Sequence, residues 1–376
     1  MTSPKRSARR HAADDQTESL DTAVPGDDGP TTEWADADYR ADKDKSFFAR
    51  LYSGTGAFDV VGKRKQWYIV TGVILLICLA SMVFRGFTFG IDFEGGTQIA
   101  LPNTAPLTTE SVEKVISDSI GIEPQQVQTA GTGASSTIQV RIEHLNQQQT
   151  QQVSEALANA YAPAISANDV SSSDVSSTWG QEITRKMVIA LVVFLVVVFV
   201  YIAVRFDREM SVAAMASLFF DLIVTAGVYS LVGFEVTPAM VIGLLTILGF
   251  SVYDTVVVFD KVQENTRSVF ASTRRSYAEQ TNLAVNQTFM RSINTTVISV
   301  LPIISLMVVA VWMLGIGTLK DLALVQLVGI VVGTFSSIYL ASPLLVSLKE
   351  RKPEIKAHTA KVLARRRRAE AAGARA

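Results

Sequence analysis

Six apolar stretches of membrane-spanning length alternate with polar segments along the chain. They cover residues 67–84, 187–204, 211–232, 239–259, 293–313 and 322–345. A helix needs about 20 predominantly apolar residues to cross a bilayer. The pattern therefore predicts a polytopic α-helical membrane protein with six transmembrane helices.

The long polar segment between the first two spans, residues 85–186, shows both strand and helix periodicity. The expected elements are, in order, a strand at 89–101, a helix at 107–120, a strand near 127, a turn at 131–133, a strand at 138–142, a helix at 153–161 and a strand at 170–175. Ile91 and Phe93 supply the period-two signal of the first strand. Thr108 or Thr109 is the expected N-cap of the first helix, and Gly121 is its expected end. The order β-α-β-β-α-β predicts a ferredoxin-like α+β domain with its helices on one face.

Charge sets the expected topology. Lys63, Arg64 and Lys65 precede the first span, residues 261–291 carry five basic and two acidic side chains, and residues 349–376 carry ten basic and three acidic ones. Between Phe87 and Thr184, in contrast, two basic residues stand against eleven acidic ones. Because short cytoplasmic loops are rich in Lys and Arg, we expect both termini and the 261–291 loop to be cytoplasmic. The α+β domain is then extracytoplasmic.

The two ends of the chain are polar. Residues 1–62 contain too few apolar positions for a core and are expected to form a disordered cytoplasmic tail. They do not resemble a signal peptide, since no apolar region follows their basic start for more than fifty residues. A solubilising role is favoured over docking to a partner. The basic tail 349–376 is interpreted as a topology anchor. Contact with anionic lipid or ribosomal RNA is the alternative, and no nucleic-acid partner is expected.

Composition adds two exclusions to this picture. The chain is 48% hydrophobic with a formal net charge of −1, and its one cysteine, Cys78, lies in the first span and allows no intrachain disulfide. The three histidines are scattered through polar segments, so no metal site is expected.

Three charged positions in the spans are the candidates for chemistry. Asp254 lies inside the fourth span, Asp221 inside the third, and Arg291 just before the fifth. A carboxylate at the membrane centre costs about 3 kcal/mol on insertion scales, so such residues usually have a function. The third and fourth spans are antiparallel, which would bring the two acids to similar depth. Asp260 faces another side of its helix and is expected at the interface.

The residues around Asp254 resemble a known family. Residues 249–265 read G-F-S-V-Y-D-T-V-V-V-F-D-K-V-Q-E-N, and the fourth-span motif of the SecF family is G-Y-S-x-N-D-T-V-V-V-F-D-R-x-R-E-N. Tyr253 replaces the usual Asn, and Phe250 replaces the usual Tyr. Further similar segments are G-I-D-F-E-G-G-T at 90–97, R-S-I-N-T-T at 291–296 and G-T-F-S-S-I-Y-L-A at 333–341.

The resemblance implies a subunit that, with SecD, uses the proton-motive force to assist late translocation of secreted proteins. It implies half of a bundle of the RND superfamily type, in the bacterial cell membrane. The partners implied are SecD, the SecYEG translocon, YajC or a YidC-type insertase, and an unfolded secreted polypeptide. No cofactor is implied other than protons as the coupling ion.

The resemblance also suggests roles for single residues. Asp254 is the expected proton carrier, Arg291 a gating counter-charge and Asp221 an auxiliary site of the relay. Structural roles are expected for Gly90, Asp92, Gly95, Gly96, Asp260, Asn265, Thr296, Gly329 and Gly333. Gly90, Gly95 and Gly96 would form a hinge where the first span meets the α+β domain. Gly329 and Gly333, four residues apart, would let helices approach closely.

Several alternatives remain open. The intramembrane charges could form a static ion pair that orders the bundle. An intramembrane aspartyl protease would use Tyr253-Asp254, but Asp221 lies in F-F-D-L rather than in the required G-x-G-D. No enzymatic activity is therefore expected. The remaining functional hypotheses are a half-size exporter of a small molecule or lipid and a non-pumping scaffold of the translocon.

Overall fold

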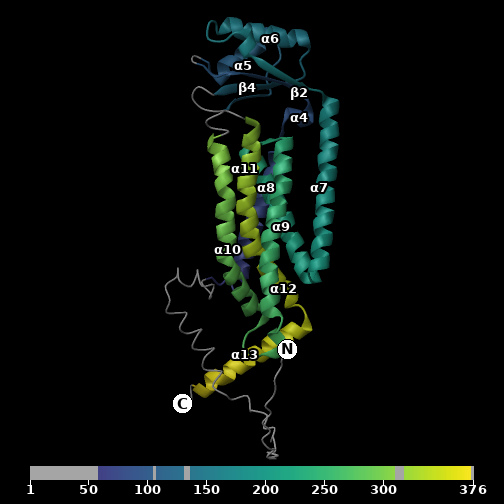
Figure 1. The fold of residues 1–376 in the computed structure, drawn as a ribbon, viewed down its shortest axis with the longest axis vertical. Helices are drawn as coiled ribbons and strands as arrows, with labels where there is room; N and C mark the ends of the chain where they lie inside the picture. Colours follow the sequence, from purple (N-terminus) through teal and green to yellow (C-terminus); the bar gives the residue numbers. More distant parts are fainter. Residues whose placement is uncertain (1–57, 105–106, 131–135, 310–316, 374–376) are drawn as a thin grey trace, which may run out of the picture. The chain divides into compact units, whose positions relative to one another are not determined.

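The computed structural model describes residues 58–104, 107–130, 136–309 and 317–373 (Figure 1). Most of the predicted N-terminal tail, the predicted turn at 131–133 and the end of the predicted fifth span lie outside these residues. Within them, six helices are long and apolar enough to cross a membrane. The described part is therefore that of a polytopic helical membrane protein.

Three of the six helices form the centre of the bundle. The helices are α3 (Arg64–Phe84), α7 (Ser177–Arg205), α8 (Arg208–Val232), α9 (Pro238–Thr266), α10 (Tyr277–Leu306) and α11 (Gly317–Ser336), which continues through a π-helical turn (Ser337–Ala341) into α12 (Ser342–Lys349). About half of the apolar part of α8, α9 and α11 is buried, whereas α3, α7 and α10 are mostly exposed. Figure 1 shows α8, α9, α10 and α11 side by side, with α7 at one side. The acids Asp221 and Asp254 thus belong to the two helices, α8 and α9, that other helices surround.

The expected loop at 261–291 is wrong for most of its length. Helix α9 continues to Thr266, and α10 already begins at Tyr277. Ser276 starts α10 with a capping box, in which its side chain and that of Glu279 each accept a backbone N–H. Buried apolar residues continue at helical spacing into both extensions, including Val262 and Val285. Polar residues are frequent in these turns, although Thr281, Asn286 and Thr288 are buried. This polar composition hid the helices in the sequence.

The boundary of the second span also differs. Helix α7 begins at Ser177 rather than at Met187, because Ser176 caps it by accepting the backbone N–H of Trp179 at 3.3 Å. An exposed ion pair of Lys186 with Glu182 lies on the extra turns. The polar domain consequently ends near residue 175.

The α+β domain contains a four-stranded antiparallel sheet. Its elements are β2 (Gly96–Pro102), α5 (Thr109–Ile120), β3 (Gln126–Ala130), β4 (Thr137–Ile142), α6 (Gln147–Ala160) and β5 (Ser171–Val175), and the spatial order of the strands is β3-β4-β2-β5. Both helices lie on one side of the sheet in Figure 1 and share a buried core with it. The predicted end signals of α5 are confirmed, with Thr108 as N-cap and Gly121 at φ 68°.

The first predicted strand is only partly right. Ile91 and Phe93 belong to a single helical turn, α4 (Ile91–Glu94), and the strand β2 begins only at Gly96. Gly95 and Gly96 have φ values of 80° and 130°, which L side chains rarely adopt, and this bend ends the turn. Before it, β1 (Thr88–Phe89) pairs in parallel with β6 (Glu235–Val236), the connection between α8 and α9.

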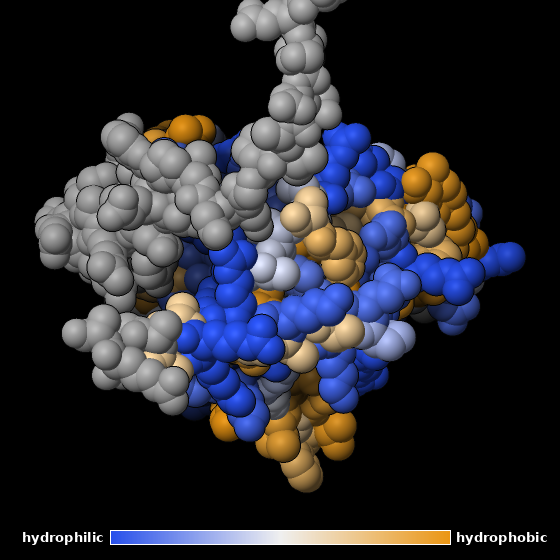
Figure 2. Space-filling model, turned by 90° about the horizontal axis from the view of Figure 1, so that it is seen from below, coloured by the Kyte–Doolittle hydropathy of each residue, from blue (hydrophilic) through white to orange (hydrophobic). Residues whose placement is uncertain are grey.

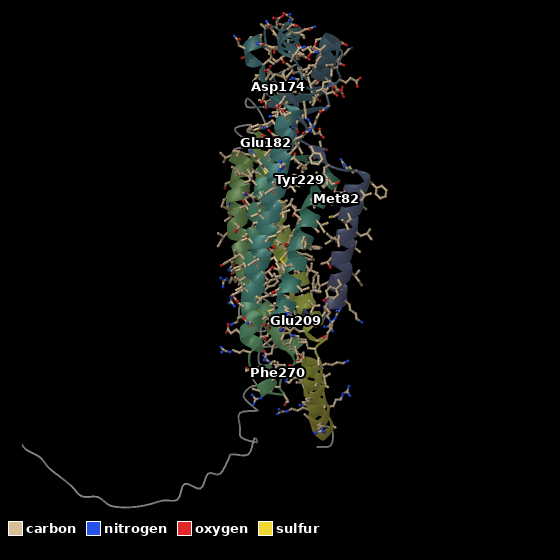
Figure 3. The ribbon with its side chains drawn as sticks, turned by 90° about the vertical axis from the view of Figure 1, so that its right-hand side faces the viewer. Met82, Asp174, Glu182, Glu209, Tyr229 and Phe270 are labelled. Atoms are coloured by element: carbon tan, nitrogen blue, oxygen red, sulfur yellow. The ribbon has the colours of Figure 1, made fainter. Side chains whose placement is uncertain are left out.

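At the end of the bundle away from the α+β domain, ion pairs connect the start of α8 to the end of α12 and the residues that follow it. Figure 3 labels Glu209 and Tyr229 near the two ends of α8, with Asp174 in the sheet domain beyond. Lys349 pairs with Asp207 at 2.8 Å, and Lys352 pairs with Glu209 at 2.8 Å. The last helix, α13 (Pro353–Gly373), follows here, and Figure 2 shows hydrophilic residues across this face with hydrophobic ones at its rim.

Thr97→Val tests how the sheet is held. The Thr97 hydroxyl is buried, donates to Asp174 at 2.9 Å and accepts the N–H of Leu145 at 2.9 Å. The isosteric valine leaves the buried Leu145 N–H without an acceptor, which costs about 1–3 kcal/mol. We expect faster hydrogen exchange in β2, β4 and the start of α6 of the full chain. Thr129→Val, on an exposed position of β3, is the control. Equal exchange in the two variants would contradict this account.

Candidate functional site

Asp254 is buried in the middle of the bundle, with 4% of its surface exposed. Ser292 of α10 donates its hydroxyl to Oδ1 at 2.7 Å, and Ser337 donates to Oδ2. Ser337 is the first residue of the π-helical turn that follows α11. Side chains from two neighbouring helices therefore satisfy both oxygens of a carboxylate that α9 carries.

Asp221 lies beside this group on α8 and is 1% exposed. Its Oδ2 accepts a hydrogen bond from Ser251, which is three residues before Asp254 on α9. Its Oδ1 has no hydrogen-bond partner among the described residues. The two acids are thus linked to the same turn of α9.

No ion pair neutralises either acid in the described part of the chain, where the ion pairs all involve other residues. Arg291 precedes Ser292 on α10, but its side chain is exposed and donates to the Tyr253 hydroxyl at 3.2 Å. Tyr253 is the position at which the SecF motif has Asn. The structure therefore shows no static ion pair at Asp254, and the gating role of Arg291 stays a prediction.

Small residues let α11 approach α9 at this site. A Cβ atom added to Gly329 would lie 2.5 Å from the Ile247 side chain, and one added to Gly333 would lie 2.9 Å from Cβ of Ser251. The hydroxyls of Thr296 and Thr334 meet at 2.7 Å and join α10 to α11. These contacts place α11 so that Ser337 reaches Asp254.

The π-helical turn has a local cause. Pro343 has no N–H to donate to the carbonyl of residue 339, and its ring crowds that carbonyl. In the same turn, the Ser342 hydroxyl donates to the Ser337 carbonyl at 3.3 Å. Helices often widen at such points, and single π turns are frequent at functional sites.

The other predicted residues have positions outside this group. Asp260 pairs with Arg205 at the end of α7 at 2.6 Å, and Asn265 donates to Gln287 at 2.9 Å. Gly90 donates its N–H to Val236 at 2.8 Å, at the junction of α3 with the domain. Burial raises the pKa of Asp92 at the same junction.

Sequence analysis did not identify the serines that donate hydrogen bonds to the two acids. Ser251, Ser292 and Ser337 look like ordinary small residues of apolar helices. Their spacing offers one signal, because Ser251 lies one helical turn before Asp254. The others depend on how three separate helices meet. Within the described residues, no group of three or more His, Cys, Asp or Glu side chains is placed to hold a metal ion.

Comparison with known families settles the relationship. The model of the SecD/SecF protein-export membrane protein C-terminal region matches residues 153–351, and that of the SecD/SecF GG motif matches residues 80–102. A protein translocase subunit SecF of Mycobacterium tuberculosis is 56% identical over 95% of this chain and 81% of its own length. The chain belongs to the SecF family. It is accordingly a multi-pass membrane protein of the protein-transport machinery.

Two further relatives extend this result. The SecF subunit of Streptomyces coelicolor is 39% identical, with 86% of each chain covered. The crystal structure of SecDF, described as a translocon-associated membrane protein, from Thermus thermophilus aligns with a TM-score of 0.67 at 30% identity. That alignment covers 78% of this chain but 39% of the SecDF chain. These SecF-family relatives carry the name of translocase subunits rather than of enzymes.

Gly333→Ala tests the close approach of α11 to α9. The new methyl would push Ser251 and separate the helices, and such overpacking costs about 1–3 kcal/mol. We expect a lower melting temperature of the purified protein in detergent. Gly249→Ala is the matched control, since a Cβ there meets nothing within 4 Å. Equal melting temperatures for both variants would show that the α9–α11 contact is not tight.

Proposed function

We propose that this SecF-family chain, with SecD, uses the proton-motive force to assist late translocation of secreted proteins. The observation that carries the proposal is the environment of Asp254. Its carboxylate is buried, both oxygens are bonded by serine hydroxyls, and no ion pair neutralises it within the described residues.

Serine hydroxyls suit a group that gains and loses a proton. A hydroxyl donates to an ionised carboxylate, and its oxygen accepts from a protonated one. Asp254 can therefore change its charge without breaking an ion pair. A proton that binds from one side and leaves to the other moves along the membrane potential, which supplies about 2.3 kcal/mol per charge per 100 mV.

Asp221 and Arg291 are given supporting roles. Asp221 reaches α9 through Ser251 and would respond to the charge of Asp254 by repulsion between like charges. Arg291 adjoins Ser292, so a change of its rotamer would bring a positive charge toward the ionised carboxylate. We infer that it acts as the gating counter-charge. Protons are the coupling ion, and no other cofactor takes part.

The SecDF relatives support the choice of partner. Chains named SecDF from Thermus thermophilus and Bacillus subtilis align with this chain over 39% and 38% of their length. We infer that SecD completes the bundle here. The further partners are the SecYEG translocon, YajC or a YidC-type insertase, and the unfolded secreted polypeptide.

The α+β domain is assigned to the outer side of the bacterial cell membrane. Its element order and the strand order β3-β4-β2-β5 support a ferredoxin-like domain. Its few basic residues, against the basic segments 63–65, 261–291 and 349–376, support cytoplasmic termini. Movement of this domain is then available to act on a chain that emerges outside.

Asp254→Asn is the deciding variant. The amide keeps the size of the side chain and a hydrogen-bonding oxygen, but it cannot carry a proton at physiological pH. We expect export of a secreted reporter to slow in cells and to lose its response to an uncoupler. Export is measured with and without the uncoupler, alongside the membrane level of the variant and its co-purification with SecD.

Asp260→Asn is the control, because Asp260 lies on the same helix but pairs with Arg205 near the surface. It should keep the full response to the uncoupler. If Asp254→Asn is present, assembled and still responds fully, the proton-relay proposal is overturned. The chain would then be a non-pumping scaffold.

A further inference from the structure

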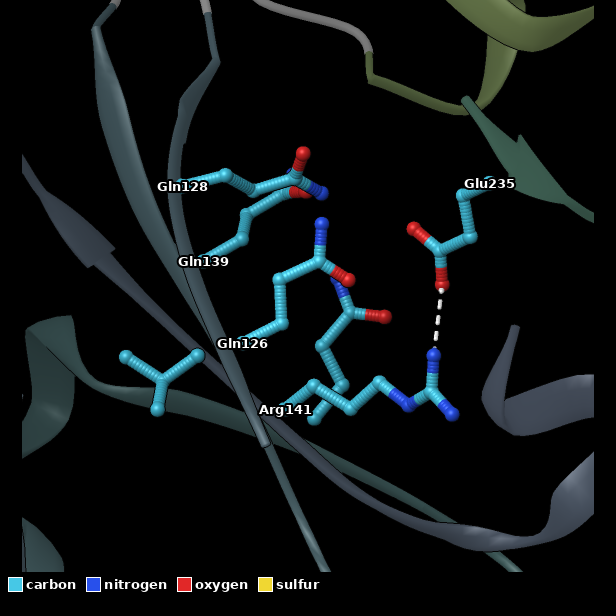
Figure 4. Close-up of a pocket in the computed structure, with 7 residues that line it drawn as sticks. Gln126, Gln128, Gln139, Arg141 and Glu235 are labelled. Atoms are coloured by element: carbon cyan, nitrogen blue, oxygen red, sulfur yellow. Dashed lines mark hydrogen bonds and ion pairs between the residues drawn. The ribbon is translucent and has the colours of Figure 1, made fainter. Parts of the chain in front are cut away.

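Arg141 is a buried charge in a domain that has few basic residues. It lies on β4 and is 8% exposed. Between Phe87 and Thr184, the basic residues are Arg141 and Lys114. Figure 4 shows its side chain pointing along a polar cavity toward Glu235. The cavity is lined by Gln98, Gln126, Gln128, Gln139, Val140, Arg141 and Glu235. A buried guanidinium requires partners, and here they come from outside the sheet.

Arg141 pairs with two carboxylates at once. Its Nη2 lies 2.5 Å from Oε2 of Glu94, and its Nη1 lies 3.5 Å from Oε1 of Glu235. Glu94 is the last residue of α4, and Glu235 lies in β6, between α8 and α9. The planar guanidinium can hold two acceptors in one fixed arrangement. One side chain of the sheet therefore contacts two elements of the bundle end.

Helix α4 is attached to the bundle by contacts on two sides. The β1–β6 ladder and the bond from Gly90 N–H to the Val236 carbonyl tie the preceding residues to the α8–α9 connection. On its other side, a Cβ atom added to Gly180 of α7 would lie 2.3 Å from the Phe93 carbonyl oxygen. Glu94 is thus held by α7 and by β6.

The sheet is joined to this base by two adjacent chain segments. One is Gly95–Gly96, where both residues have positive φ and no side chain restricts the bend. The other is the link from Val175 to Ser176, and Val175 is the ladder partner of Gly96. Two neighbouring connections define a pivot and leave rotation about it to be fixed by other contacts. Among the described residues, the ion pairs that cross this pivot are those of Arg141.

We propose that Arg141 is a positioning residue that fixes the angle of the α+β domain on the bundle. It does so through its ion pairs with Glu94 and Glu235, which lie on the other side of the Gly95–Gly96 hinge. Glu235 directly follows the helix that carries Asp221 and precedes the one that carries Asp254. A shift of these helices is passed to the sheet through Arg141. This last step rests on the proposed function, whereas the positioning itself does not.

The charge balance around Glu235 supports the need for Arg141. Burial raises the pKa of Glu235, and the carboxylate of Asp92 acts in the same direction. Arg141 and Lys320 oppose this effect and favour the ionised form. Without Arg141, the carboxylate would be buried beside another acid with weaker compensation.

The test measures the position of the domain directly. Spin labels are attached at Gln148→Cys on α6 and Leu231→Cys at the end of α8, both exposed positions, in a full-length Cys78→Ala background. Pulsed dipolar spectroscopy in lipid nanodiscs gives the distance distribution. For Arg141→Gln we expect a broader distribution with a shifted mean. Arg141→Lys should keep the parental mean, because a lysine still reaches Glu94.

Lys114→Gln is the matched control, since it removes the same charge from an exposed position on α5. Its distribution should coincide with that of the parent. A Glu94→Gln, Glu235→Gln double variant keeps Arg141 but removes both partners, and should broaden the distribution as Arg141→Gln does. It replaces Arg141→Gln if that variant does not fold. Parental distributions for the double variant and Arg141→Gln would overturn the proposal.

The measurement uses no proton gradient and no transported chain. Its result is therefore independent of the role of Asp254. A failure of the Asp254→Asn export test would leave the positioning of the domain intact, and parental spin-label distances would leave the proton relay intact.

Discussion

A carboxylate without an ion pair inside a membrane bundle imposes the strictest condition on this structure. Asp254 avoids an unsatisfied charge only because hydroxyls of Ser292 and Ser337 reach both of its oxygens. Those hydroxyls belong to different helices, so α9, α10 and α11 must meet within hydrogen-bonding distance. Gly333 permits this approach, and the π-helical turn before Pro343 orients Ser337. The packing of these three helices thus provides hydrogen-bond donors for both oxygens of Asp254.

The second acid shares the same framework. Ser251 of α9 contacts Asp221 on one side and the backbone of α11 at Gly333 on the other. A change in the charge of either acid therefore acts on α9, which carries both Asp254 and Ser251. Packed interiors respond to such changes by switching between discrete arrangements, since they deform little. This property suits the proposed function, in which the charge state of the bundle drives movement.

In the proposed function, movement of the bundle reaches the α+β domain through the connection between α8 and α9. The connection between the two acid-bearing helices contains β6, which pairs with β1 and faces Arg141. The GG segment adds freedom to bend, and the ion pairs of Arg141 restrict it. A hinge that is flexible in its backbone and restrained by side chains can transmit an angle without requiring the domain itself to deform. The fold of the sheet depends on other contacts, such as those of Thr97.

The sequence by itself determined the six apolar helices, the strand and helix order of the domain for the most part, and the family. These features follow from local periodicity, caps and contiguous motifs, which a chain carries along its length. It also singled out Asp254, because a charge in an apolar run is costly wherever the helix packs. The serines that hold Asp254 and the partners of Arg141 were decided by tertiary structure alone. Serine has no distinctive pattern in an apolar helix, and its role arises only when residues 254, 292 and 337 meet in space. The helical turns at 91–94, 261–266 and 277–291 were likewise not identified from the sequence, where their polar residues outweighed the helical signal.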